Sequence, residues 1–140
     1  MVTEKLKIGM LFPLRKEHEP LNKLCQDYPI EIVNTPYIEA NELRSDRGLN
    51  SGVNSGLYAE PNIDDNTKLE WQECVAIVSM DLPSDPRSLF PNLGWFQGVS
   101  AGYDHIDSSI LKEMGVVQTS ARGIASASIS EFVFARLLQV

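Results

Sequence analysis

The chain has 140 residues, of which 43% are hydrophobic and 22% charged, and its formal net charge is −7 at pH 7. This composition is typical of one soluble globular domain with a core of its own. The acidic balance and the lack of a Lys/Arg stripe argue against nucleic acid or an anionic membrane as the main partner. No apolar run is long enough to span a bilayer, and the opening MVTEKLKIGM lacks a signal-peptide core, so we expect a cytoplasmic protein.

The two cysteines, Cys25 and Cys74, are predicted to be ordinary buried thiols, one on a helix face and one in a strand. Metal sites need more Cys or His ligands at suitable spacing than this chain offers. We therefore expect no metal site and no disulfide.

The first part of the chain predicts two strands around one helix. Residues 7–12, KIGMLF, form a buried strand that Pro13 ends. Between residues 21 and 28 the apolar side chains recur at i, i+3, i+4 and i+7, which predicts a helix with Pro20 in its first turn. Residues 30–34, IEIVN, predict the second strand.

Residues 45–67, SDRGLNSGVNSGLYAEPNIDDNT, combine Gly, Ser, Asn, Asp and Pro with little periodicity. We expect a long solvated loop or a mobile excursion here, with a functional lid as the alternative. Its glycines are spaced by four, which matches neither a G-x-G-x-x-G turn nor a P-loop. The pair Asp64–Asp65 is placed in this loop rather than after a strand, so it does not indicate a phospho-acceptor site.

The second part of the chain predicts three more strands, at residues 74–80, 94–99 and 116–119. Asp107 is expected to cap a short helix between the last two strands, and Gly115 to end it. Strands that alternate with helices form parallel sheets through right-handed crossovers. We therefore expect an α/β fold, a flavodoxin-like three-layer sandwich with a five-stranded parallel sheet.

The last segment predicts a helix that opens with the capping box Ser128–Glu131 and runs to Val140. Its FVFARLLQV is apolar nearly all round, and such a helix must be buried on every side. We take residues 1–126 as one domain and residues 127–140 as the start of a helix that leads to a further domain. The alternative is a helix that docks on its own sheet.

Ligands of parallel α/β sheets gather at the carboxyl ends of the strands. Three such ends are residues 13–15, 79–81 and 100–102. The third, Ser100–Ala101–Gly102, is a small-small-Gly turn whose uncovered backbone N–H groups can cradle an anion such as a carboxylate. A plain turn residue at Gly102 explains the sequence equally well.

Three charged or titratable residues outside this turn are also candidates for a functional role. His105 lies between Asp104 and Asp107, and a His beside a carboxylate can act as a general base. Side chains just past a turn, however, more often face solvent or bind nearby backbone groups. Arg15 could meet an anion at the first strand end or be a solvated charge, and His18 is predicted to lie at the surface.

Residues 91–107, PNLGWFQGVSAGYDHID, and residues 114–138, MGVVQTSARGIASASISEFVFARLL, resemble the D-isomer-specific 2-hydroxyacid dehydrogenases. The shared pattern is an aromatic-rich strand, S-x-G-x-D, a further strand, a loop with Gly and a helix that begins "AE" in the family. Here that helix has Ser130–Glu131.

The resemblance implies a flavodoxin-like substrate-binding (catalytic) domain that is joined to a Rossmann NAD-binding domain. It also implies that the full-length protein interconverts D-2-hydroxy acids and 2-oxo acids by hydride transfer with NAD or NADP, as a homodimer. A stand-alone flavodoxin-like binding or regulatory domain that dimerises through its last helix is the alternative.

The resemblance also assigns roles to particular residues. In the family, the S-x-G loop holds the substrate carboxylate through backbone amides, and this role falls here on Ser100, Ala101 and Gly102. A second loop that walls the substrate in the family corresponds here to Ser79 and Met80. A contact with the cofactor falls on Ser126. The family's catalytic His, Glu and Arg lie further along than this chain extends, so we expect no catalytic residue here and an inactive chain on its own.

Overall fold

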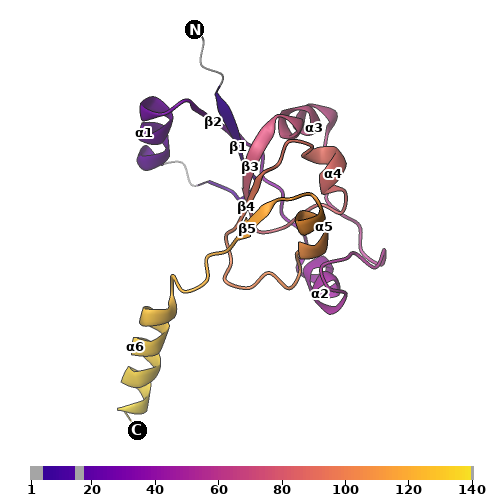
Figure 1. The fold of residues 1–140 in the computed structure, drawn as a ribbon. Helices are drawn as coiled ribbons and strands as arrows, with labels where there is room; N and C mark the ends of the chain where they lie inside the picture. Colours follow the sequence, from indigo (N-terminus) through magenta and orange to yellow (C-terminus); the bar gives the residue numbers. More distant parts are fainter. Residues whose placement is uncertain (1–4, 15–17, 140) are drawn as a thin grey trace.

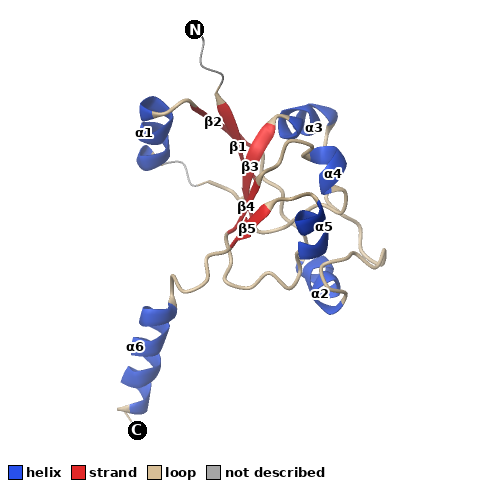
Figure 2. Ribbon diagram, viewed as in Figure 1, coloured by secondary structure: helices blue, strands red, loops and turns tan. Residues whose placement is uncertain are grey.

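The computed structural model describes residues 5–14 and 18–139. Its centre is a parallel sheet of five strands in the order β2-β1-β3-β4-β5 (Figures 1 and 2). Every strand that the sequence predicts is present, with ends that differ by at most two residues. The α/β fold class is therefore confirmed. The strands are β1 (Leu6–Met10), β2 (Ile30–Asn34), β3 (Cys74–Ser79), β4 (Trp95–Gly98) and β5 (Val117–Thr119).

Helices lie on both sides of the sheet. In Figure 1, α2, α3, α4 and α5 lie on one side, α1 lies on the other, and α6 points away from the sheet. Among the described residues, no helix combines the length and the apolar character that crossing a membrane requires. The helices are α1 (Glu19–Asp27), α2 (Asn41–Leu49), α3 (Asp65–Gln72), α4 (Pro86–Leu89), α5 (Ser108–Glu113) and α6 (Ser126–Leu137).

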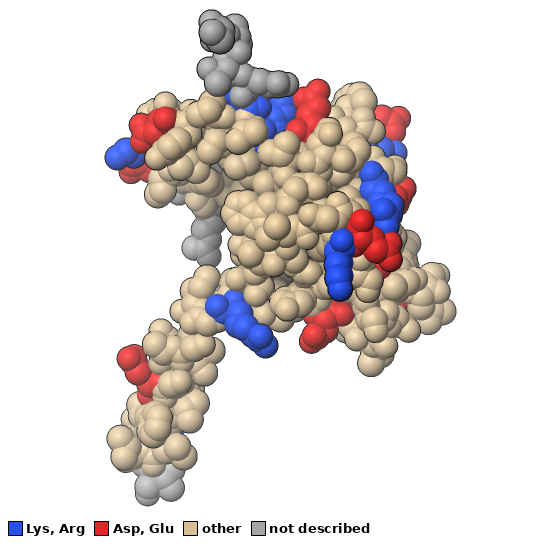
Figure 3. Space-filling view, viewed as in Figure 1, with Lys and Arg blue, Asp and Glu red and all other residues tan. Residues whose placement is uncertain are grey.

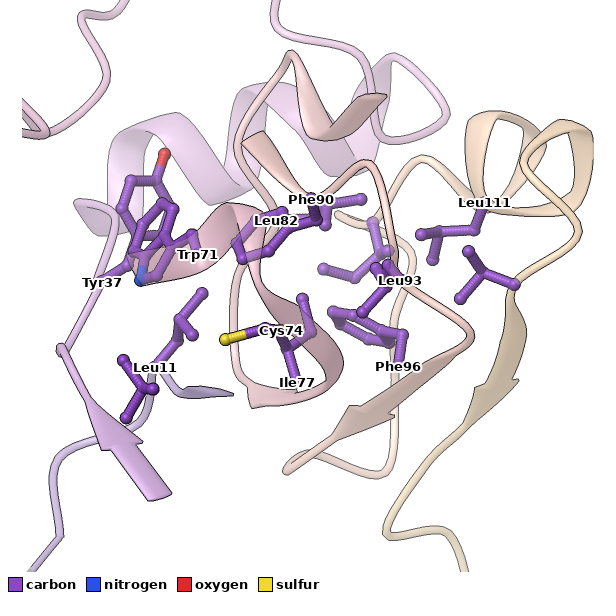
Figure 4. Close-up of a cluster of buried hydrophobic side chains, with 13 residues drawn as sticks. Leu11, Tyr37, Trp71, Cys74, Ile77, Leu82, Phe90, Leu93, Phe96 and Leu111 are labelled. Atoms are coloured by element: carbon purple, nitrogen blue, oxygen red, sulfur yellow. The ribbon is translucent and has the colours of Figure 1, made fainter. Parts of the chain in front are cut away.

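The hydrophobic core lies between the sheet and the helices α3, α4 and α5 (Figure 4). Its largest side chain, Trp71, stacks on Phe90 with the ring centroids 4.9 Å apart, and it meets Tyr37 edge-on at 5.9 Å. The indole Nε1 of Trp71 donates a hydrogen bond to Oγ1 of Thr35 at 2.6 Å. Large aromatic side chains that pack together and bond their polar atoms stabilise a domain of this size most effectively.

Both cysteines are free thiols, one in a helix and one in a strand as predicted, but the prediction that both are buried holds only for Cys74. Cys74, in β3, belongs to the core, and its burial raises the pKa of the thiol to about 11. Cys25, in α1, is half-buried. A thiol with so high a pKa is a poor nucleophile, so Cys74 serves packing.

The other face of the sheet is covered less completely. Trp95 of β4 and Val117 of β5 are paired, so their side chains share this face, and they are 42% and 61% exposed. The helix on this side, α1, buries none of its own residues. The outer layer on this side is therefore thin, whereas the opposite face supports the core.

The surface carries both signs of charge. On the face that Figure 3 shows, Lys and Arg side chains stand beside Asp and Glu side chains, and no broad basic area is seen.

The start of α6 differs from the prediction. The helix begins at Ser126 with Ala125 as its N-cap and no side-chain cap, so the predicted capping box at Ser128–Glu131 is wrong. The reason is Gly123, whose left-handed φ of 89° turns the chain early and lets its carbonyl accept the N–H of Ser126. Ser128 is then already inside the helix.

The side chains of α6 are exposed on every side of the helix. Its large apolar residues, from Ile129 to Leu138, have between 47% and 86% of their surface exposed. The alternative that this helix docks on its own sheet is therefore not seen. The division into residues 1–126 and 127–140 stays a prediction.

The predicted loop at residues 45–67 is wrong at both ends. Residues 45–49 belong to α2 and residues 65–67 to α3. The apolar periodicity is weak because two of the three buried residues of α2 are charged, Asp46 and Arg47. Asp64, expected in the loop, is the N-cap of α3 and accepts the N–H of Thr67 at 3.0 Å.

Candidate functional site

The carboxyl ends of β3 and β4 lie side by side. Ser79 pairs with Gly98, and the N–H of Val99 donates to the carbonyl of Ser79 at 3.0 Å. The loops that follow the two strands therefore start next to each other. These are the second and third strand ends at which the sequence predicts a ligand.

The Ser100–Gly102 turn leaves its backbone amides free. Its own contacts are a hydrogen bond from Oγ of Ser100 to the carbonyl of Gly102, and one from the N–H of Ala121 to the carbonyl of Ser100 at 3.1 Å. The N–H groups of Ala101 and Gly102 donate to no acceptor among the described residues, and both residues are exposed. Two adjacent unpaired N–H groups are a suitable site for an anion.

The structure shows how Gly102 fits into the turn. Its φ lies outside the left-handed region, and a Cβ added there would meet no heavy atom within 4 Å. The turn therefore does not require glycine for its conformation. Glycine therefore leaves open space where a side chain would stand in this turn.

Ser79 and Met80, the predicted second substrate loop, occupy different environments. Ser79 is fully buried, and its hydroxyl donates to the carbonyl of Asp81 at 2.6 Å and accepts the N–H of Asp81 at 3.2 Å. Its side chain thus shapes the turn after β3. Met80 is half-buried, and its carbonyl oxygen lies 2.7 Å from Nε2 of His105.

A buried ion pair fixes the residue after Met80. Asp81 is fully buried, and its two carboxylate oxygens accept Nε of Arg44 at 2.6 Å and Nη2 of Arg44 at 2.9 Å. The same carboxylate accepts the backbone N–H of Glu39 at 2.8 Å. The hydrogen bond to Asp81 raises the pKa of Arg44. Such a two-point pair holds the loop after β3 against α2.

A second buried pair lies beside the first. The guanidinium of Arg47 donates from Nε and Nη2 to the two oxygens of Glu39, both at 2.9 Å, and each side chain is at most 2% exposed. Burial raises the pKa of Glu39 and also that of Tyr37, whose hydroxyl donates to Glu39 at 2.9 Å. Arg47 also binds Glu60 at 2.9 Å, which ties the middle of the long loop to α2.

The glycine-rich loop packs against the segment that follows the candidate carboxylate site. Gly52 has a φ of 88°, and a Cβ there would lie 2.3 Å from both the N of Asp107 and the carbonyl carbon of Ile106. Arg47 binds the carbonyl of Gly52 at 3.0 Å. This part of the predicted loop is therefore a packed structural element.

Residues 104–107, with the sequence DHID, largely have the structure that the sequence predicts. Asp107 caps α5 by accepting the N–H groups of Ser109 and Ile110 at 3.0 and 3.1 Å, and Gly115 ends that helix with a φ of 74°. His105 binds a backbone carbonyl, but one that is 25 residues away rather than local.

The remaining predicted residues lie apart from this site or outside the described part. Ser126 is an exposed residue at the start of α6. His18, predicted at the surface, is half-buried at the N-cap of α1. Arg15 lies outside the described residues. Within residues 5–14 and 18–139, no group of three or more His, Cys, Asp or Glu side chains is arranged to hold a metal ion.

Sequence reasoning did not find the two buried ion pairs. Asp81 lies two residues after the end of β3, at the carboxyl edge of the sheet, and this position is a signal that could have indicated it. Its partner Arg44 is 37 residues away in a segment without apolar periodicity. No spacing rule connects the two.

Comparison with known proteins finds similarity both in sequence and in fold. No family model matches the chain. Over 107 residues, 76% of the chain, it is 29% identical to the erythronate-4-phosphate dehydrogenase of Shewanella sediminis (strain HAW-EB3), of which it covers 26%. The crystal structure of D-lactate dehydrogenase from Aquifex aeolicus, complexed with NAD and lactic acid, matches 94% of the chain with a TM-score of 0.56 and 20% identity.

The chain spans 26% of the first protein and 32% of the second. Both are dehydrogenases by name, and the second shares the fold of this chain. The resemblance to the D-isomer-specific 2-hydroxyacid dehydrogenases that residues 91–138 indicate is therefore confirmed.

Proposed function

We propose that this chain, which resembles the D-2-hydroxyacid dehydrogenases in sequence and fold, is the substrate-binding part of such an enzyme. The reaction would interconvert D-2-hydroxy acids and 2-oxo acids by hydride transfer with NAD or NADP. The observation that carries the proposal is the pair of free N–H groups of Ala101 and Gly102, with open space before them, at the carboxyl end of β4.

The two amides supply what a 2-hydroxy or 2-oxo acid needs for orientation. A carboxylate that accepts both N–H groups is fixed at one end, and hydrogen bonds to a charged acceptor are about twice as strong as neutral ones. The reacting carbon next to the carboxylate then has a defined position, which raises the rate of transfer to or from it. The half-buried Met80, one strand over, is the candidate wall of this site.

The described loops are suited to hold the amides still. Asp81 is fixed by Arg44 beside one wall, and the backbone of Gly52 presses on the Ile106–Asp107 peptide behind the turn. Donors that are already in place need no reorganisation when charge arrives. The buried ion pairs thus support the carboxylate site without contacting the substrate.

The nicotinamide cofactor would supply or accept the hydride. The sequence holds no G-x-G-x-x-G, the glycine pattern that binds a dinucleotide in Rossmann folds. We propose that a further domain binds the cofactor, with Ser126 at the start of α6 as the contact from this chain. We expect a cytoplasmic enzyme that acts as a homodimer.

The exposed apolar side chains all around α6 favour a second candidate function. In that case the chain is a stand-alone binding domain that dimerises through α6. Analytical ultracentrifugation of the 140-residue chain distinguishes the two, because a concentration-independent monomer contradicts pairing through α6.

An enzyme assay tests the main proposal. The whole gene product that contains this chain is purified and supplied with NADH or NADPH and a panel of 2-oxo acids, with loss of the reduced cofactor as the signal. We expect turnover with at least one acid and a product of the D configuration, and no turnover by the 140-residue chain alone. Turnover by that chain, an L product, or inactivity with every acid would contradict the proposal.

A further inference from the structure

His105 connects the two loops at the carboxyl edge of the sheet. Its Nε2 lies 2.7 Å from the carbonyl oxygen of Met80, and its side chain is 16% exposed. A carbonyl oxygen can only accept, so Nε2 must carry a proton. The bond therefore runs from the loop after β4 to the loop after β3, across 25 residues of sequence.

We propose that His105 is a positioning residue that sets the Ser100–Gly102 turn relative to Met80. This role rests on the proposed carboxylate site, because positioning matters only if the amides of that turn bind substrate. His105 touches neither substrate nor cofactor in this proposal and is not a general base.

Each end of the connection is anchored independently. On the β3 side, Asp81 is held by two hydrogen bonds from Arg44 and one from the N–H of Glu39. On the β4 side, Ile106 is 3% exposed in the core, and Asp107 caps α5. The imidazole bridges these two anchored segments. The buried ion pair thereby also restricts the motion of the residues beside the turn.

The hydrogen bond from Val99 to Ser79 joins the strand ends just before the two loops, but the turn itself has few bonds of this kind. Its own hydrogen bonds are the one from Oγ of Ser100 to Gly102, inside the turn, and the one from Ala121, in the loop after β5. Neither fixes the distance between the free amides and Met80. Nε2 of His105 also lies 3.8 Å from Oδ1 of Asp81, too far for a hydrogen bond, so the Met80 carbonyl is its acceptor.

The first test reads the ring itself in the full chain. Nitrogen-15 NMR of the wild-type imidazole distinguishes the two neutral tautomers. We expect Nε2 of His105 to carry a proton that it donates to Met80. A neutral ring protonated on Nδ1 cannot donate to Met80 and would overturn the proposal.

The second test uses variants that differ in reach. In His105→Gln the side-chain amide N–H can still approach the Met80 carbonyl, whereas in His105→Asn the side chain is too short. His18→Gln, at the N-cap of α1, is the matched control for losing a histidine. The readouts are ¹⁵N relaxation of the backbone amides at residues 79–81 and 100–103, and titration with pyruvate.

We expect His105→Asn to make the amides of Ala101 and Gly102 more mobile and to weaken pyruvate binding about tenfold, and His105→Gln to restore both. Wild-type order and affinity in His105→Asn would overturn the proposal. If the wild-type chain binds no pyruvate or other 2-oxo acid, the proposed function fails, while the relaxation data still decide whether His105 holds the turn.

Discussion

At Gly102 the backbone leaves open space where a side chain would stand, whereas at Gly52 it leaves none. The same residue type therefore does two different jobs in this chain. At Gly102 it keeps a surface clear, and at Gly52 it lets one backbone press on another. Substitution by alanine separates these jobs, because one change affects binding and the other affects stability.

Gly102→Ala should fold as well as the parent and bind substrate less well. No atom lies within 4 Å of the added Cβ, and a Gly to Ala change at a compatible φ stabilises by about 0.4–1 kcal/mol. In the proposed site, however, the methyl group would take up open space beside the two amides. We expect an unchanged or slightly higher melting temperature and about tenfold weaker pyruvate binding by calorimetry.

Gly48→Ala is the matched control, since Gly48 lies in α2 and its added Cβ also meets nothing. It should raise stability by up to about 1 kcal/mol, because alanine is the better helix former, and leave binding as it was. Equal binding by the two variants would show that the space before the turn is not used.

Gly52→Ala should destabilise the domain strongly. Its Cβ would lie 2.3 Å from two backbone atoms that side-chain rotation cannot move, and overpacking of this kind costs about 1–3 kcal/mol in addition to the cost of a left-handed φ. Gly56 has the same φ of 88° but open space around it. Gly56→Ala should therefore lower the free energy of unfolding only by the cost of the left-handed backbone conformation, about 1–2 kcal/mol. Urea unfolding of both variants gives the difference, and equal losses would show that the contact with Ile106–Asp107 is not needed.

Among the helices and strands, α2 is the one whose buried face the sequence pattern did not indicate. The helix turns charged side chains inward, where Arg44 and Arg47 meet the carboxylates of Asp81 and Glu39. Buried pairs of this kind do not add much net stability, because desolvation offsets their attraction. Their effect is to fix the loops after β2 and β3 in one arrangement.

Arg47→Met should lower the free energy of unfolding at pH 7 by about 3–5 kcal/mol, because it leaves the carboxylate of Glu39 buried without its partner. Lys68→Met breaks the exposed pair with Asp65 and should cost less than about 1 kcal/mol. Urea unfolding measures both. Similar losses for the two variants would mean that Glu39 finds solvent or another donor when Arg47 is removed.

The elements also show what the sequence could and could not predict. The strands were predictable because each is a short apolar run bounded by turn residues, and residues 74–79 are the clearest case. The helix α2 was missed because apolar periodicity cannot detect a buried face made of Asp46 and Arg47. The start of α6 was misplaced because the turn at Gly123 decides it rather than the S-x-x-E pattern.

The candidate site, too, could be predicted only in part. The Ser100–Gly102 turn was predictable, because a parallel sheet places ligands at its strand ends and small residues leave the amides free. The support behind it was not, since it depends on contacts such as that of Gly52 with Ile106, between residues far apart in the sequence. Only the folded chain brings these residues together.

For the whole molecule, the carboxylates predict a loss of stability in acid. Hydrogen bonds from Ser55 lower the pKa of Asp46, and those from Thr67 lower that of Asp64. Burial raises the pKa of Glu60, but its hydrogen bonds with Ser84 and Asn54 and the charge of Arg47 together bring that pKa below its ordinary value. A lowered folded pKa means that the unfolded chain takes up the proton first as the pH falls. The stability from these groups is therefore present above their ordinary values and is lost below them.

We expect the free energy of unfolding to fall as the pH drops below the ordinary values of 4.5 for Glu and 3.8 for Asp. Glu39 acts in the opposite direction, because burial raises its pKa and protonation then favours the folded state. Asp46→Asn should flatten the decline, whereas Asp65→Asn, at an exposed carboxylate, should not. Urea unfolding between pH 3 and pH 7 checks this, and an identical decline in Asp46→Asn would contradict the role of its bonds to Ser55.

The central claim is that the backbone N–H groups of Ala101 and Gly102 bind the carboxylate of a 2-oxo or 2-hydroxy acid. Its most direct measurement follows the amide resonances of the ¹⁵N-labelled chain during titration with pyruvate, and with neutral pyruvamide as the control. We predict saturable downfield shifts at these two amides with pyruvate and none with pyruvamide. Shifts that are absent, that centre elsewhere, or that pyruvamide reproduces would contradict it.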